Sequence, residues 1–165
     1  MQQAERAFAS ALALRREGYG PSAATAALIG NYARTLLRNS KAGAALPLVE
    51  EAEAMARTHA GESSPLTLSL QATRAEALIG LGRLEAATST LDSLERGGLP
   101  VALELRKGVL RGTLAHARGD LSAARAELTR VRDTAQSLGV VADTVRVDMD
   151  ALQRLVDPPA SDGAD

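Results

Sequence analysis

The hydrophobic positions of this chain recur every three or four residues over most of its length. One such stripe consists of Ala26, Ile29, Ala33, Leu36 and Leu37. This spacing places apolar side chains on one face of a helix. No run alternates apolar and polar residues for long enough to form a strand. The pattern therefore predicts an all-α protein.

Glycine and proline divide this pattern into about eight helices. Glycine is favoured at the end of a helix, proline cannot continue the hydrogen-bond ladder, and serine is a preferred N-cap. Breaks of this kind occur at residues 18–22, where Ser22 is the expected N-cap, at 61–65 and at 97–100. The predicted helices cover about residues 2–17, 23–38, 42–60, 66–81, 84–96, 101–118, 121–138 and 140–156.

Pro47 is the unusual residue of the third predicted helix. If that helix begins near Gly43 or Ala44, the proline falls in the first turn, where a missing N–H costs little. We therefore interpret Pro47 as a first-turn residue.

The tight turns between the helices form an internal repeat. Ser40, Gly82 and Gly119 stand at equivalent places in three turns, 42 and then 37 residues apart. In each unit a small residue precedes the turn by seven positions, and apolar residues follow it by five, nine and twelve. The residues at these positions are Ala33, Ala45, Val49 and Ala52, then Ala75, Ala87, Leu91 and Leu94, then Gly112, Ala124, Leu128 and Val131.

The repeat has a direct physical interpretation. Small residues where two helices cross let the backbones approach, and larger aliphatic side chains fill the layer between neighbouring hairpins. One hairpin cannot bury its apolar face alone, so the hairpins are expected to stack. The alternative is an ordinary helical bundle, rich in Ala and Leu, whose segments resemble one another by chance. The joint recurrence of turns, small residues and glycine–proline breaks favours the repeat.

These residues resemble the tetratricopeptide repeat (TPR) family, and in particular the longer repeat of roughly 42 residues seen in kinesin light chains and many bacterial regulators. The matching residues are Gly20-Pro21, Asn31-Tyr32-Ala33, Leu36, Ser40-Lys41, the run from Ala45 to Ala52, and Gly61 with Pro65. The resemblance covers about residues 4–138 and implies a right-handed α-solenoid of stacked antiparallel helix hairpins. Ser40 departs from the usual turn glycine, and no tryptophan or tyrosine fills the aromatic position beside the turn.

The expected organisation is one TPR-like helical repeat domain over residues 1–156. Its parts are a half repeat at 1–20, repeats at about 22–60, 65–97 and 100–138, a capping helix at 140–156, and a disordered tail at 157–165. The polar outer face of the last helix suits a cap.

The opening helix matches the second half of a repeat, with Ala4, Phe8 and Ala11 in the places of Ala45, Val49 and Ala52. Half a hairpin leaves an apolar face uncovered. We therefore expect either that the chain is the C-terminal part of a larger signalling or regulatory protein, with an upstream domain, or that it forms a homodimer through this half repeat.

Composition and charge narrow the function. Hydrophobic residues make up 45% of the 165 residues but aromatic residues only 2%, so the core is expected to consist mostly of Ala and Leu. The net charge is −1, and no basic stripe is interleaved with aromatic residues, which argues against a nucleic-acid partner. The chain has no cysteine and no apolar run near the roughly 20 residues that span a bilayer. Its first residues lack a signal-peptide pattern. We therefore expect a cytoplasmic protein with no membrane contact.

No catalytic constellation stands out. His59 and His116 have no second ligand at the spacing of a metal site. The pair Gly80 and Gly82 lacks the third glycine and the preceding strand of a dinucleotide-binding loop. The sequence therefore predicts a protein without metal or cofactor that is not an enzyme; an all-α enzyme with an unrecognised site is the remaining alternative.

The resemblance implies that the first helix of each hairpin lines a concave groove that receives a peptide or a partner's helix. Asn31 can bond a peptide backbone as both donor and acceptor, and Arg34 and Arg38 lie one turn apart, where they can together hold a carboxylate. The alternative is that the arginines are solvated or pair with Glu76. The groove candidates are Asn31, Arg34, Arg38, Thr73, Glu76, Arg106, Thr113 and His116.

The favoured function is therefore a non-catalytic protein–protein interaction scaffold that binds a peptide or partner segment in this groove. The alternative is a regulatory domain that senses a ligand or signal peptide and controls an attached kinase or DNA-binding domain. A closed pocket lined by Ala and Leu favours the sensor, and an open polar groove favours the scaffold.

Overall fold

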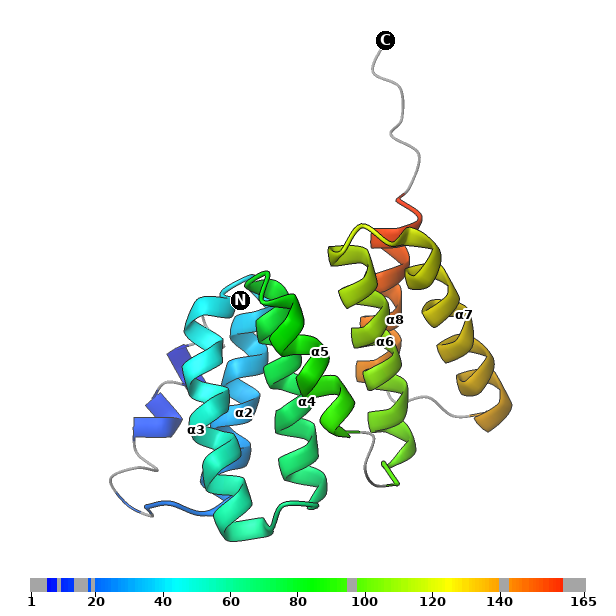
Figure 1. Ribbon diagram of the computed structural model, residues 1–165. Coiled ribbons are helices and arrows are strands. Elements are labelled where there is room, and N and C mark those ends of the chain that lie inside the picture. The colour runs from blue at the N-terminus through cyan, green and yellow to red at the C-terminus, as the bar shows by residue number, and fades with distance from the viewer. Residues whose placement is uncertain are drawn as a thin grey trace. The chain divides into compact units, whose positions relative to one another are not determined.

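The computed structural model describes residues 6–8, 10–13, 18, 20–94, 98–139 and 143–158, and their regular structure is helical throughout (Figure 1). Residues 6–8 and 10–13 are helical. The helices that follow are α2 (Ala23–Arg38), α3 (Ala42–Ala60), α4 (Pro65–Gly80), α5 (Leu84–Ser93), α6 (Val101–Ala117), α7 (Leu121–Leu138) and α8 (Asp143–Val156). The predicted all-α class is confirmed.

The helix bounds follow the glycine and proline signals closely. Helices α2, α3 and α7 span the predicted residues, and α4 begins one residue earlier than predicted because Pro65 occupies its first turn after the N-cap Ser64. Some predicted segments lie outside the described residues: the helix ends at residues 2–5, 95–96 and 140–142, and the part of the tail at residues 159–165.

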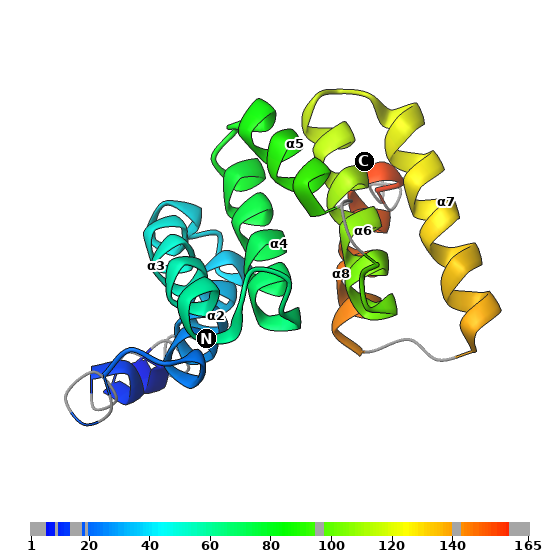
Figure 2. The same ribbon diagram turned by 60° about the horizontal axis from the view of Figure 1, so that its bottom comes forward.

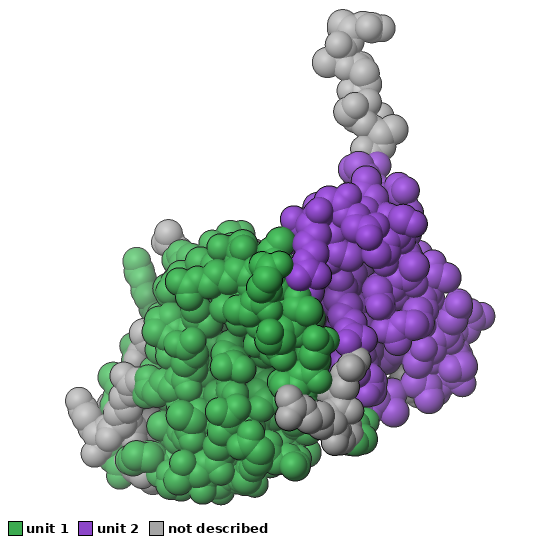
Figure 3. All heavy atoms as spheres, in the orientation of Figure 1, with its two compact units in different colours: residues 1–99 green, residues 100–165 purple. Residues whose placement is uncertain are grey.

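The chain divides into two compact units, residues 1–99 and 100–165 (Figure 3). Unit 1 contains α2 to α5, and unit 2 contains α6 to α8. The division falls in the predicted break at residues 97–100. Each unit is described by itself below.

The three hairpin turns share one backbone geometry. Ser40, Gly82 and Gly119 have φ values of +57°, +69° and +81°. At each turn this residue donates its N–H to the carbonyl three residues earlier, and the next residue donates to the carbonyl five residues before itself, at N···O distances of 2.9 Å. This is the Schellman arrangement that ends a helix. The predicted equivalence of the three turns is confirmed.

The starts of α2 and α4 share a second local structure. The hydroxyl oxygens of Ser22 and Ser64 accept from the N–H of Thr25 and of Thr67, both at 3.1 Å. Each threonine hydroxyl in turn donates to the carbonyl of a preceding glycine, at 3.0 and 2.7 Å. Ser22 is therefore an N-cap, as predicted. The two caps lie 42 residues apart, the spacing of the first two hairpin turns.

All twelve small or apolar repeat positions are buried. The three alanines five residues past the turns, Ala45, Ala87 and Ala124, are completely inaccessible to solvent. Leu91 and Leu128, four residues further along, are also buried, and burial of a leucine contributes roughly 1.5–3 kcal/mol. The faces predicted from the repeat are confirmed.

Glycine permits close helix approach in both units. A Cβ added to Gly30 of α2 would lie 2.5 Å from Leu70 Cδ2 of α4. A Cβ on Gly112 of α6 would lie 2.5 Å from Leu152 Cδ2 of α8 and 3.4 Å from the carbonyl oxygen of Ala124 in α7. Gly112 is the small residue that the repeat predicts at this crossing. Its close approach to the Ala124 carbonyl explains why a small residue is needed there.

The prediction that Pro47 lies in the first turn of its helix is wrong. Helix α3 begins at Ala42, and the Lys41 carbonyl already accepts from the N–H groups of residues 44 and 45 at 3.1 and 3.0 Å. Pro47 therefore lies inside the helix. The carbonyl that loses its partner belongs to Gly43, which is exposed and accessible to water, so the helix continues through the proline.

The opening segment does not repeat the burial of its predicted counterpart. The Phe8 ring stacks on Tyr32 of α2, with ring centroids 6.1 Å apart, and remains half-buried. Ala11 is exposed, whereas Ala52, its predicted equivalent, is completely buried. Ala4 lies outside the described residues. The segment therefore covers part of α2 without reproducing the repeat at residue 11.

In unit 2, α8 packs against both α6 and α7 (Figures 1 and 2). The apolar residues of the three helices form one cluster, which includes Leu105, Leu128 and Leu152. The outer face of α8 is exposed, as predicted, and carries Asp143, Arg146, Asp150 and Arg154.

Candidate functional site

The predicted groove residues of α2 lie on one exposed face of that helix. Asn31 and Arg38 are exposed, and Arg34, between them, is half-buried and engaged in an interaction of its own. Residues spaced by three and four share a helix face. The structure therefore brings together the three residues that the sequence predicted from the first full repeat.

The predicted groove residues of α4 are less accessible to a partner than those of α2. Thr73 is buried, and its hydroxyl donates to the carbonyl of Ser69 at 2.9 Å. Glu76 is half-buried and has an interaction partner. Thr73 therefore serves the helix itself and presents no hydroxyl to a groove.

The remaining candidates belong to α6, in unit 2. Arg106 is buried, the hydroxyl of Thr113 donates to the carbonyl of Val109 at 3.0 Å, and His116 is half-buried. The predicted set is thus divided between the two units, and only its α2 members form a group with exposed polar atoms.

A hollow of about 570 Å³ lies between α3, α4 and α5, within unit 1. Among the described residues, α3 and α5 each pack against α4 and not against each other. Leu68, Gln71 and Arg74 of α4 line the hollow between them. Arg57 and Glu62 stand on the α3 side. The sequence did not predict this site.

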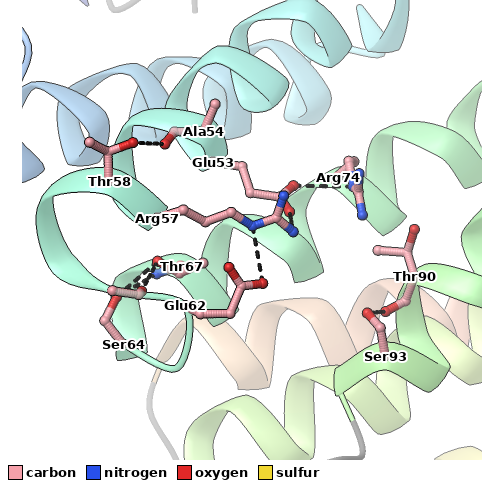
Figure 4. Close-up of polar contacts among 11 residues, drawn as sticks. Glu53, Ala54, Arg57, Thr58, Glu62, Ser64, Thr67, Arg74, Thr90 and Ser93 are labelled. Atoms are coloured by element: carbon pink, nitrogen blue, oxygen red, sulfur yellow. Dashed lines mark hydrogen bonds and ion pairs between the residues drawn. The ribbon is translucent and has the colours of Figure 1, made fainter.

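A buried glutamate holds the two arginines of the hollow. The Glu53 side chain is 3% exposed; its Oε1 lies 2.6 Å from Nη2 of Arg57, and its Oε2 lies 3.2 Å from Nε of Arg74 (Figure 4). Arg57 also approaches Glu62 through Nε, at 3.2 Å. Neither Glu53 oxygen has a contact aligned as a hydrogen bond, and the same holds for Nε of Arg74. The attraction is therefore an ion pairing that joins α3 to α4.

The α5 wall of the hollow consists of hydroxyl groups. Ser89, Thr90 and Ser93 donate to the carbonyls of residues 85, 86 and 90, at 3.1, 2.8 and 2.7 Å. A hydroxyl that donates its proton in this way keeps its oxygen as an acceptor. Figure 4 shows Thr90 and Ser93 across from Arg57 and Glu62, with Arg74 above Thr90 and Ser93 in this view. The hollow thus has charged groups of both signs on the α3 side and hydroxyl acceptors on the α5 side.

The signal for this site was present in the sequence. Glu53 stands four residues after Val49 and three before Ala56, on the apolar stripe of α3. A charged residue on a buried stripe requires a partner. Arg57, one turn later on the same helix, is one partner of this carboxylate. Arg74 is a second partner, which the packing of α4 against α3 brings close.

No group of three or more His, Asp or Glu side chains in the described part of the chain is arranged to hold a metal ion. His59 is exposed at the end of α3, and His116 lies on α6. Within the same residues, none of the helices combines the length and the apolar character needed to cross a membrane.

Comparison with protein-family models, with curated proteins and with solved structures finds no match.

Proposed function

We propose that this protein is a non-catalytic interaction module, a right-handed TPR-like stack of helix hairpins that binds a segment of a partner protein. The observation that supports this proposal most directly is the recurrence of one hairpin turn at Ser40, Gly82 and Gly119, with the same hydrogen bonds and buried positions. Repeated hairpins of this kind stack to give extended surfaces, and their rigid helices reduce the ordering cost of binding.

The binding surface that we propose is the exposed face of α2. Asn31 offers an amide to a peptide backbone, and Arg38, with Arg34 one turn before it, offers positive charge. The partner segment is therefore expected to carry acidic side chains. Thr73 is left out of this surface because it is buried.

A library of random peptides displayed on phage tests the proposal. The wild-type protein is expected to enrich peptides rich in Asp and Glu, and the double variant Arg34→Glu, Arg38→Glu to enrich none of them. The control is Arg146→Glu with Arg154→Glu, which reverses two charges on the exposed face of α8. Enrichment of the same acidic peptides by the α2 double variant contradicts the proposal, as does the absence of such peptides from the wild-type selection.

A ligand-sensing regulatory domain is the second candidate, because unit 1 contains a hollow of about 570 Å³, which is large enough for a small molecule. The hollow is open and is lined by arginine and hydroxyl groups beside leucine, so it is not the closed Ala and Leu pocket expected of an apolar sensor. If this candidate holds, the ligand is a small polar molecule.

A further inference from the structure

Arg74 has a guanidinium that is only partly engaged. Its Nε lies 3.2 Å from Glu53 without a hydrogen bond, and the structure records no other interaction for its guanidinium among the described residues. The side chain is 29% exposed and lines the hollow. A guanidinium carries five N–H donors in a planar fork. The two terminal nitrogens of Arg74 are therefore available to a ligand.

The other arginine of the hollow is engaged in two ion pairs. Arg57 contacts Glu53 through Nη2 and Glu62 through Nε. Arg74 is therefore the guanidinium whose two terminal nitrogens both lie outside these ion pairs, and this fork matches the two oxygens of a single carboxylate. A phosphate dianion would bring two negative charges to this one guanidinium, close to two glutamates. The donor set thus favours a carboxylate over a phosphate.

Among the described residues around the hollow, the charges are balanced. Glu53 and Glu62 offset Arg57 and Arg74, so a ligand with net charge would leave an unpaired charge in a partly desolvated place. A zwitterionic ligand adds no net charge to the hollow. Its ammonium group can donate to Glu62, whose side chain is 68% exposed, or to the hydroxyl oxygens of α5.

We propose that the hollow between α3, α4 and α5 binds a free amino acid. Its carboxylate accepts from the fork of Arg74, its ammonium group donates to Glu62 and the hydroxyls of Ser89 and Ser93, and its side chain lies against Leu68. This inference does not rest on the peptide surface of α2, because the residues of the two sites are different.

Thermal unfolding with the twenty free amino acids, each at about 10 mM, tests the proposal. At least one amino acid is expected to raise the Tm of the wild-type protein by about 4 °C, as a ligand at roughly ten times its Kd does for a domain of this size. The shift is expected to vanish in Arg74→Gln and to persist in Arg38→Gln, which alters an exposed arginine outside the hollow. Sodium acetate and inorganic phosphate, at the same concentration, are expected to give no shift.

Ser89→Trp keeps the test decisive if Arg74→Gln fails to fold. Ser89 is exposed on α5 and lines the hollow, so the indole occupies this space while Glu53 and Arg74 themselves stay unchanged. This variant is expected to lose the amino-acid shift. The proposal is overturned if no amino acid stabilises the wild-type protein, if either hollow variant keeps the full shift, or if acetate or phosphate gives a shift as large. An intact amino-acid shift in a wild-type protein that enriches no acidic peptides would instead reject the α2 surface alone.

Discussion

Ser40 shows how far one residue can depart from its repeat without changing the fold. It adopts the left-handed conformation, with φ of +57°, that Gly82 and Gly119 adopt at the two equivalent turns. Side chains with a Cβ are strained in this region, by about 1 kcal/mol or more. The turn nevertheless forms, because the two hydrogen bonds to Leu36 and Leu37 close the helix end.

We predict that Ser40→Gly stabilises unit 1 by about 0.5–1 kcal/mol. Glycine removes the backbone strain at this position, and the higher entropy that it gives the unfolded chain offsets only part of that stabilisation. Gly119→Ser, the matched reverse change, is expected to cost about 1 kcal/mol. No atom lies within 4 Å of a Cβ added to Gly119, so backbone conformation alone sets this cost. Urea unfolding measures both free energies. Changes of the same sign in the two variants would contradict the equivalence of the turns.

Glu53 illustrates the opposite case, a residue whose role depends on its partner. The sequence places a carboxylate on a buried stripe and an arginine four residues later. It does not indicate that Arg74 of α4 approaches the same carboxylate, because that contact arises from the packing of two helices. For this reason the sequence alone does not predict the hollow. The α2 group of Asn31, Arg34 and Arg38 was predictable, because one helix determines it.

At the scale of the element, α8 is held at its end by polar contacts as well as by its apolar face. Arg125 of α7 donates through Nη2 to the Val156 carbonyl at 2.9 Å and through Nε to Asp157 at 3.0 Å. Arg132 of α7 donates to Gln153 of α8. A cation beside the carbonyl end of a helix also interacts favourably with its dipole.

We expect Arg125→Ala to destabilise unit 2 by about 1 kcal/mol, because the change leaves the last carbonyls of α8 without this donor. Arg146→Ala serves as the control. Arg146 is exposed, and its nearest contact with Asp143 is 3.9 Å, so its loss is expected to change stability by less than about 0.5 kcal/mol. Chemical denaturation of both variants gives the comparison. Equal effects would mean that the Arg125 contacts contribute nothing beyond surface charge.

At the scale of the whole molecule, the chain divides into two compact units, residues 1–99 and 100–165. Unit 2 has its own apolar cluster, in which Leu128 and Leu152 are almost inaccessible. Each unit is compact by itself, so damage to the apolar cluster of unit 2 need not spread to unit 1.

Leu152→Ala is expected to destabilise unit 2 by about 2–5 kcal/mol, the usual cost of a large-to-small change in a core. Hydrogen exchange followed by mass spectrometry should then show faster exchange in α6, α7 and α8, with protection in α2 and α3 nearly unchanged. Equal loss of protection in α2 and α3 would show that the two units unfold as one.

The local features of this protein can be predicted from its sequence: the helices, their capped ends, the three equivalent turns and the buried face of each hairpin. These features depend on residues a few positions apart, whose periodicity and turn chemistry are visible along the chain. The tertiary structure decided the contacts between residues from different helices: the close approach at Gly112, the burial of Thr73, the pairing of Glu53 with Arg74 and the hollow beside them. The reason is that helix packing places residues of different helices against one another, such as Glu53 of α3 and Arg74 of α4, and no spacing along the chain indicates which residues will meet.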